Sequence, residues 1–230
     1  MKEVAEDLEL TILMPCLNEG NSVGFCVAQA RRYLELKGIF GEVLVVDNGS
    51  IDSSYERASK AGARVITCRD KGYGNALRCG IKHARGKYIV MGDCDGSYDF
   101  SRLDDILIEL RDGCDLVVGN RLDGIQQGAM PFLHQYFGVP FLSWLGRLCY
   151  KTDITDFHCG LRGVNRANFS KLRFKSTGME FASEMIGKAV KGGLSICEVP
   201  IVLYPDQRGK KSHLRPFRDG LRHIKVILTS

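Results

Sequence analysis

Two aspartates separated by one residue, Asp93 and Asp95, are the side chains of this 230-residue protein that could most readily do chemistry together. They follow residues 87–92 (KYIVMG), a short run rich in β-formers that predicts a buried strand. Residues two apart in an extended chain point to the same side, so the two carboxylates repel each other unless a cation lies between them. Mg²⁺ or Mn²⁺ is the expected cation, because such ions bind one or two carboxylates together with substrate phosphates. A solvated acidic turn is the alternative interpretation of so short a motif.

Short strands and helices in alternation would position these aspartates. Strands are expected over residues 8–14, 42–46, 64–68, 87–92 and 115–121, and helices over 23–33, 53–61, 71–84 and 103–110. This alternation predicts a single α/β domain with a Rossmann-like, mostly parallel central sheet flanked by helices. Ligands bind such sheets at the carboxyl ends of the strands. Polar residues follow the predicted strands there and favour a working site, namely Asn18, Glu19, Asp47, Asn48, Lys71, Asp93, Asp95 and Arg121.

The second half of the chain has a less regular pattern. An apolar helix is expected over residues 139–150, a loop over 153–162 and a strand pair over 194–203. Residues 124–138 show no clean period, so a mobile loop and an amphipathic segment both stay open. Residues from about 206 to 230 form a basic tail that suits an acceptor phosphate or a membrane surface, or is a solvated chain end. Without a linker or a repeat, residues 1–230 are expected to form one domain.

Composition restricts the class of protein. With 44% hydrophobic and 26% charged residues, the chain is typical of soluble globular proteins, and a formal charge of +5 gives no indication of nucleic acid as a partner. The nine cysteines are scattered without a CxxC pair, which argues against a disulfide framework or a zinc site and favours a cytoplasmic location. The polar residues 1–9 predict no signal peptide, and no apolar run has membrane-spanning length. Work at a membrane would therefore require peripheral contact, with the cytoplasmic face expected.

Several segments, in order along the chain, carry a resemblance to a known family. They are residues 14–19 (MPCLNE), 45–52 (VVDNGSID), 71–76 (KGYGNA), 93–95 (DCD) and 118–121 (VGNR). Together they resemble family 2 glycosyltransferases with the GT-A fold. Residues 156–162 (DFHCGLR), 198–201 (EVPI) and 215–220 (RPFRDG) are similar to the subgroup of dolichyl-phosphate mannose and glucose synthases. The resemblance covers nearly the whole chain.

The resemblance implies a role for each matching residue. Metal binding falls to Asp93 and Asp95, and the catalytic candidates are Asp95, Arg121 and Asp156. The nucleotide would be bound by Pro15, Leu17, Asn18, Glu19, Asp47, Asn48, Lys71, Gly74, Asp93 and Cys94. Phosphate groups of donor or acceptor would be bound by Arg162, Arg208, Lys210 and His213. Two positions depart from the family pattern, since Asn48 stands where aspartate is common and His213 where a lysine often follows Ser212.

The implied reaction is attack on the anomeric carbon of a nucleotide-linked sugar, with a nucleoside diphosphate as the leaving group. A metal ion and cationic side chains would stabilise the departing charge. A sugar hydroxyl as nucleophile needs a base, for which Asp156 is the candidate. A lipid phosphate has a second pKa of about 6 and needs no base, only cations that bind it. We therefore expect a metal-dependent inverting glycosyltransferase that moves a hexose from a UDP- or GDP-linked sugar to a polyprenyl or dolichyl phosphate.

Other functions are compatible with parts of this pattern. The chain could transfer sugar to a hydroxyl of a glycan or glycolipid, or bind a nucleotide sugar without catalysis as a scaffold for a membrane partner. A nucleotidyltransferase on a similar sheet would release pyrophosphate. A Rossmann dehydrogenase is disfavoured, because no GxGxxG follows the first predicted strand.

Overall fold

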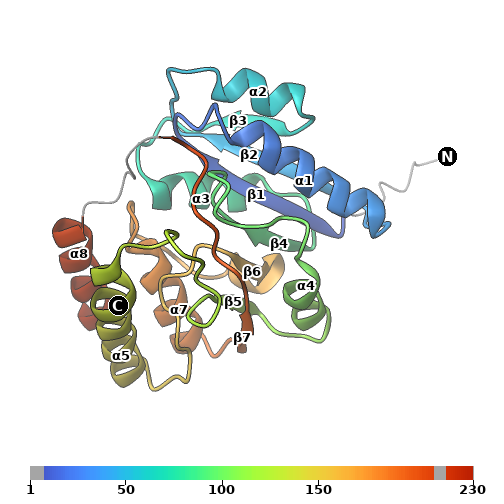
Figure 1. Ribbon diagram of the computed structural model, residues 1–230. Helices are drawn as coiled ribbons and strands as arrows, with labels where there is room; N and C mark the ends of the chain where they lie inside the picture. Colours follow the sequence, from blue (N-terminus) through green and yellow to red (C-terminus); the bar gives the residue numbers. More distant parts are fainter. Residues whose placement is uncertain (1–7, 210–215, 230) are drawn as a thin grey trace.

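The computed structural model describes residues 8–209 and 216–229, and its centre is one seven-stranded sheet (Figure 1). The strand order is β3-β2-β1-β4-β6-β5-β7. Neighbouring strands are parallel except that β6 runs antiparallel to both β4 and β5. The strands are β1 (Leu10–Cys16), β2 (Gly41–Asp47), β3 (Arg64–Thr67), β4 (Tyr88–Met91), β5 (Leu116–Asn120), β6 (Arg162–Asn165) and β7 (Ile196–Pro200). The predicted α/β fold with a mostly parallel sheet is confirmed.

Helices flank the sheet in two groups. In the first group α1 packs against α2, and the hydroxyl of Tyr33 on α1 donates a hydrogen bond to Asp104 on α4 at 3.4 Å. In the second group α3 packs against α7, and α5, α7 and α8 pack against one another. The helices are α1 (Val23–Leu36), α2 (Ser54–Lys60), α3 (Tyr73–His83), α4 (Asp104–Arg111), η1 (His134–Gly138, a π-helical turn), α5 (Val139–Tyr150), α6 (Arg166–Phe169), α7 (Phe181–Lys191) and α8 (Pro216–Thr229).

The central strands β1, β2 and β4 bring the predicted ligand-binding loops to one edge. All seven residues of β1 and all four of β4 are buried, as expected for near-continuous apolar strands covered on both faces. The parallel register places Cys16 beside Asp47 and Leu13 beside Met91. The loops after the three strands therefore open next to one another.

Three predictions for the second half of the chain need correction. The loop expected over residues 153–162 is confirmed up to Leu161, but Arg162 begins strand β6, which was not predicted and is completed by hydrogen bonds to β4 and β5. The predicted strand pair over 194–203 is wrong, because β7 ends at Pro200 and only a single bridge joins Leu203 to Ile125. Residues 216–229 of the expected basic tail form helix α8, whereas Lys210 and His213 lie outside the described residues.

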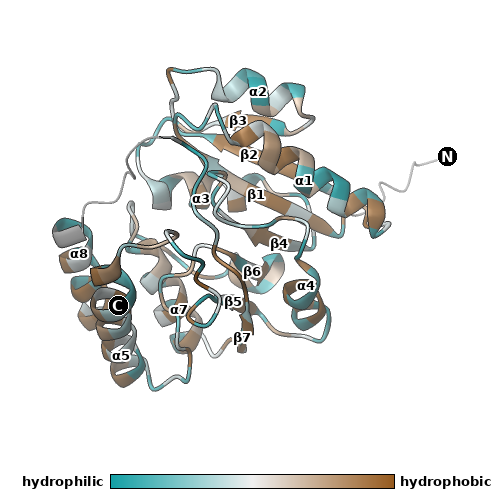
Figure 2. Ribbon diagram, viewed as in Figure 1, coloured by the Kyte–Doolittle hydropathy of each residue, from teal (hydrophilic) through white to brown (hydrophobic). Residues whose placement is uncertain are grey.

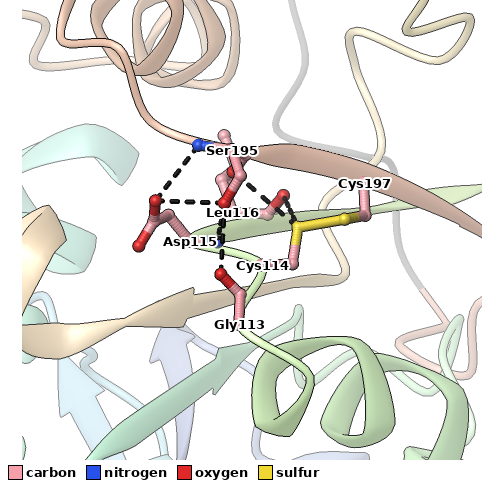
Figure 3. Close-up of a disulfide and its surroundings, with 6 residues drawn as sticks. All are labelled: Gly113, Cys114, Asp115, Leu116, Ser195 and Cys197. Atoms are coloured by element: carbon pink, nitrogen blue, oxygen red, sulfur yellow. Dashed lines mark hydrogen bonds between the residues drawn. A yellow bond between two sulfur atoms is a disulfide. The ribbon is translucent and has the colours of Figure 1, made fainter.

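A disulfide between Cys114 and Cys197 contradicts the expectation that the cysteines stay unpaired (Figure 3). The two residues are 83 positions apart in sequence, and the parallel pairing of β5 with β7 brings them together. Beside them, the Asp115 carboxylate accepts hydrogen bonds from the amide and the hydroxyl of Ser195, each at 3.1 Å. Sequence spacing reveals only local cysteine pairs, so this long-range pair was missed.

Residues 201–208, which we call the strap, continue from β7 across the sheet toward the cleft described below (Figure 1). The amide of Tyr204 donates to the carbonyl of Ser97 at 2.9 Å, and the amide of Gln207 donates to the carbonyl of Asp95 at 2.7 Å. The strap therefore lies along the loop that carries the two aspartates. Within residues 8–209 and 216–229, none of the helices has the length and apolar character needed to cross a membrane.

Candidate active site

Some of the residues predicted to bind a ligand gather at a cleft of about 380 Å³ at the carboxyl ends of β1, β2 and β4, whereas Arg121, Asp156 and Arg162 are not among the described residues that line it. The start of α3, the turn at residues 178–179, the end of the strap and the first turns of α8 complete its walls. The predicted residues that line it are Pro15, Leu17, Glu19, Asn48, Asp93, Cys94, Asp95 and Arg208. The cleft is also lined by residues to which sequence reasoning gave no role, among them Tyr73, Met179, Arg218, Asp219 and Arg222.

Asp93 lies between a tyrosine and the second aspartate of the motif. Tyr73, in the first turn of α3, forms a hydrogen bond with the Asp93 carboxylate. Burial and the nearby charge of Asp95 raise the pKa of Asp93 to about 6, although this hydrogen bond and the charges of Arg208 and Arg121 act in the opposite direction. Ionised Asp93 is therefore costly for the protein alone, and a bound cation would relieve that cost.

Asp95 is oriented by the tight turn that follows it. Its Oδ1 accepts hydrogen bonds from the amide of Ser97 at 2.9 Å and from the hydroxyl of Ser97 at 2.6 Å. Gly96 has a φ of 87°, which side-chain-bearing residues rarely adopt, and a Cβ there would meet Gln207 of the strap. The remaining carboxylate oxygen, Oδ2, is held in an ion pair by Arg208.

Arg208, at the end of the strap, supplies positive charge at the motif. Besides Asp95, its guanidinium pairs with Glu19 at 3.6 Å and with Asp206 at 3.4 Å. Burial alone would lower the pKa of Arg208, but these carboxylates raise it, so the group stays charged. A guanidinium held in this way can bind a phosphate through parallel hydrogen bonds.

Asp47 ends β2 and turns its carboxylate toward its own loop. It accepts hydrogen bonds from the amides of Gly49 and Ser50, each at 3.2 Å. Lys71 reaches the same loop, where its Nζ donates to the carbonyls of Asn48 at 2.9 Å and Gly49 at 3.4 Å. Both side chains shape the loop beside the cleft, and neither is among the described residues that line it.

Asn18 joins the loops after β1 and β2. It has a positive φ of 57°. Its side-chain Oδ1 accepts a hydrogen bond from the backbone amide of Ile51, and its backbone amide donates one to the hydroxyl of Ser50, both at 2.8 Å. Asn18 thus positions its cleft-lining neighbours Leu17 and Glu19.

The hydrogen bonds of the Asn48 side chain require an amide at this position, where aspartate is common in the family that the sequence resembles. Its Nδ2 donates to the carbonyls of Cys68 at 3.2 Å and Asp70 at 2.8 Å, and its Oδ1 accepts from the amide of Gly72 at 2.7 Å. A carboxylate has no proton to donate to the two carbonyls, so aspartate could not replace this amide. Asn48 therefore ties the end of β3 to the start of α3 while it lines the cleft.

Two glycines let α3 begin directly against the turn at residues 176–178. A Cβ on Gly72, whose φ is 124°, would lie 2.2 Å from the carbonyl oxygen of Thr177. A Cβ on Gly74 would lie 2.7 Å from the carbonyl oxygen of Ser176. The predicted nucleotide-binding residue Gly74 thus lies at this backbone contact, which places Tyr73 in the cleft.

Arg121 and Asp156, two of the catalytic candidates, form a buried ion pair. Arg121 Nε lies 2.8 Å from Asp156 Oδ2, and Arg121 Nη2 lies 3.2 Å from Asp156 Oδ1. The Asp156 side chain is fully buried. Burial opposes the charge of Arg121, but the carboxylate outweighs it and raises the pKa of Arg121. Arg121 engages both carboxylate oxygens of Asp156, so Asp156 is poorly suited to accept a proton from a substrate.

Arg162, predicted to bind a phosphate, has its guanidinium engaged by backbone. It donates to the carbonyls of Cys159 at 2.8 Å, Ala182 at 2.6 Å and Phe157 at 2.7 Å. Its side chain is buried, and burial lowers the pKa of Arg162. This arrangement holds the loop of Asp156 against α7.

The carboxylates at the cleft fit a hard divalent cation bound together with a substrate. Asp93 and Asp95 face the same cleft, and burial together with the charge of Asp95 raises the pKa of Asp93, so a bound cation would stabilise its ionised form. Among the described residues, no cluster of three or more histidine, cysteine, aspartate or glutamate side chains could hold a metal alone. Phosphate oxygens and water would have to complete the coordination, as is usual for Mg²⁺.

The missed arginines Arg218 and Arg222 had a recognisable signal. They are four residues apart in the segment RDGLR, so one face of a helix presents both. The many cations of this stretch predict a basic tail, but only a helix places two of them on one face.

Comparison with known proteins identifies the family of the chain. The model of the family described as Glycosyl transferase family 2 matches residues 11–173. The chain therefore belongs to glycosyl transferase family 2. The low-salt glycan biosynthesis hexosyltransferase Agl6 of Haloferax volcanii is 40% identical over 223 residues, which cover 96% of this chain and 53% of that protein. The dolichyl-phosphate hexose transferase of the same organism is 31% identical over 223 residues, which cover 96% of this chain and 92% of that protein. The chain thus spans about half the length of the first of these relatives.

Solved structures share the fold. Glucosyl-3-phosphoglycerate synthase from Mycobacterium tuberculosis, in complex with Mg²⁺ and uridine diphosphate, has a TM-score of 0.75 at 19% identity, covering 96% of this chain and 79% of that one. The same enzyme in complex with Mn²⁺, uridine diphosphate and glucosyl-3-phosphoglycerate has a TM-score of 0.72 at 20% identity, again covering 96% and 79%. The expected GT-A fold is confirmed.

Proposed function

We propose that this chain is a metal-dependent inverting glycosyltransferase that moves a hexose from a nucleotide sugar to a polyprenyl or dolichyl phosphate. The observation that carries the proposal is a single cleft that combines the aspartate pair with three arginines, Arg208, Arg218 and Arg222. Such a site suits a diphosphate, a divalent cation and a second phosphate together. The relative described as a dolichyl-phosphate hexose transferase supports the same acceptor class.

The donor would extend from the end of β1 to the aspartate motif. Pro15, Leu17 and Glu19 would surround the base, with Asn48 beside it, and its diphosphate would lie at Asp93 and Asp95. Mg²⁺ or Mn²⁺, when bound there, would neutralise charge on the diphosphate. Arg208 would add its own positive charge to the departing nucleoside diphosphate.

The acceptor phosphate would attack the anomeric carbon directly. One of its oxygens forms the new bond to that carbon, the bond from the carbon to the diphosphate oxygen breaks, and the nucleoside diphosphate leaves with the electron pair. A phosphate with a second pKa of about 6 is largely ionised at neutral pH and requires no base. The engagement of Asp156 by Arg121 supports this acceptor over a hydroxyl, which would need a proton acceptor. A lipid acceptor implies peripheral membrane contact, and we place it at the cytoplasmic face.

A transfer assay tests the proposal. The purified chain is incubated with Mn²⁺, labelled UDP- or GDP-sugars and a prenyl phosphate, and the glycosylated lipid is measured. We expect transfer from one donor and a loss of at least about 100-fold in Asp95→Ala, because electrostatic groups at a reacting phosphate contribute that much. Asp112→Ala, an exposed aspartate at the end of α4, is the matched control. Transfer to a glycan hydroxyl instead, or to no acceptor, would reject the proposal.

A further inference from the structure

Helix α5 buries two small residues and one tyrosine and exposes several large apolar side chains, whereas a helix on a soluble protein normally buries its apolar side. Its buried positions are Ser143, Gly146 and Tyr150. Gly146 lies so close to the protein that a Cβ there would be 2.4 Å from the ring of Phe157.

The outer side of α5 and the preceding turn forms an apolar stripe. Phe137 is 62% exposed, Phe141 54%, Trp144 55% and Leu148 64%. The spacing of three and four residues places the four on one side of the helix. Figure 2 shows hydrophobic colouring on α5 at the outer edge of the molecule. A contiguous exposed stripe of this size indicates an interaction surface.

Helix α8 extends this surface toward the cleft. It packs against α5, where the hydroxyl of Tyr150 donates to the carbonyl of Val226 at 3.3 Å, and the two helices lie side by side in Figure 1. Its exposed positions alternate between cationic and apolar residues, with Arg218 followed by Leu221, Lys225 and Leu228. The neighbouring turns of α8 also supply cleft residues, including Arg222. The apolar surface and the proposed transfer site are therefore joined by one helix.

Charge identifies the partner of this surface. Residues 124–152 contain no aspartate or glutamate, but do contain Arg147 and Lys151, both exposed. The one acid of α8, Asp219, lines the cleft. A second copy of the same face would bring cations against cations, whereas an anionic lipid surface would be complementary. Aromatic and leucine side chains flanked by cations are the composition of helices that lie in the membrane interface.

We propose that the outer faces of α5 and α8, which we call the docking face, seat the protein on an anionic lipid bilayer. This deepens the proposed function, because a bilayer would hold the lipid-phosphate acceptor next to the cleft, and it rests on that function for its purpose. Its physical test is independent, because vesicle binding requires no transfer.

The single tryptophan of the chain, Trp144, lies in the docking face and reports its environment. The protein is titrated with vesicles of phosphatidylglycerol and phosphatidylcholine in equal parts, and its emission is recorded. We expect a blue shift and quenching by brominated phosphatidylcholine. Phe141→Glu/Leu148→Glu should weaken vesicle binding at least about 100-fold, since two apolar side chains lose their burial. Leu36→Glu/Ile108→Glu changes two apolar residues of comparable exposure on α1 and α4, and this variant should bind as the wild type does.

Several results would overturn the proposal. One is an unchanged Trp144 spectrum at saturating vesicle concentration, and another is equal vesicle binding by the two double variants. A third is a dimer, without vesicles, that only Phe141→Glu/Leu148→Glu dissociates, since the surface would then belong to a second copy. Thermal unfolding of both variants confirms that each is folded.

Transfer to two acceptors separates this inference from the proposed function. Phe141→Glu/Leu148→Glu should transfer sugar normally to a short, water-soluble prenyl phosphate and poorly to a long prenyl phosphate embedded in vesicles. If the wild type transfers to neither, the proposed function fails, while the Trp144 titration still decides whether the docking face binds lipid.

Discussion

Replacing Asp93 with asparagine should stabilise the protein at neutral pH, although it removes a proposed metal ligand. Burial and the charge of Asp95 raise the pKa of Asp93 to about 6. This lies about two pH units above an ordinary aspartate, and each unit corresponds to about 1.4 kcal/mol of free energy. Two units correspond to about 2.8 kcal/mol, and because Asp93 is partly exposed, solvent screening reduces the effect to about 1–2 kcal/mol.

The sign follows from proton binding. Below about pH 4 the Asp93 carboxyl is protonated in both folded and unfolded chains, so it costs nothing. Between about pH 4 and pH 6 the unfolded chain loses this proton first, so the free energy of unfolding falls as the pH rises. Above about pH 6 the carboxyl is ionised in both states, and the decrease in the free energy of unfolding is complete. Asparagine does not titrate, so Asp93→Asn removes this decrease in the free energy of unfolding.

Urea unfolding with a chelator present, repeated from about pH 4 to pH 7, measures this effect. The wild type should lose stability relative to Asp93→Asn across that range, and the variant should be more stable at neutral pH. Asp112→Asn, at an exposed position, should follow the wild type. A variant that is less stable than the wild type at neutral pH would refute the reasoning.

Three further substitutions test the geometry around the cleft, each by urea or thermal unfolding. Asp156→Asn should lower the free energy of unfolding by about 3–5 kcal/mol because it leaves a buried arginine uncompensated. By contrast, Asp104→Asn breaks a half-exposed pair and should cost less than about 1 kcal/mol, so equal losses would contradict the account. Asn48→Asp should cost about 1–3 kcal/mol, because the carbonyls of Cys68 and Asp70 lose their donor, and unchanged stability would show that these bonds are unimportant. Gly74→Ala should cost about 1–3 kcal/mol by steric overlap. Gly220→Ala, which meets nothing within 4 Å, should gain up to about 1 kcal/mol, and the reverse order would contradict the packing described.

The sheet and the loop positions could be predicted because they depend on local patterns. Apolar runs such as those of β1, β2 and β4 predict buried parallel strands, and the carboxyl ends of such strands must meet. The aspartate motif, Glu19 and Asn48 therefore reach one cleft. Strand β6 was missed because its pairing with β4 and β5 is antiparallel and long-range, which no local period reveals.

Side-chain direction was the harder part of the site to predict. Asp47 binds the amides of its own turn, a local preference of aspartate that sequence reasoning could have weighed. The pairing of Arg121 with Asp156 and the binding of Arg162 to three carbonyls depend on tertiary partners. The same holds for Arg222, which reaches the cleft only because α8 packs against α7.

Calorimetric titration with nucleotides tests most directly whether the cleft is a metal-dependent donor site. UDP, GDP and their sugar conjugates are titrated into the protein with Mn²⁺ and, separately, with a chelator. The account predicts binding of one nucleotide that requires Mn²⁺ and is abolished in Asp95→Ala but kept in Asp112→Ala. Binding that is unaffected by the chelator and by Asp95→Ala, or no binding of any nucleotide, would contradict the central claim.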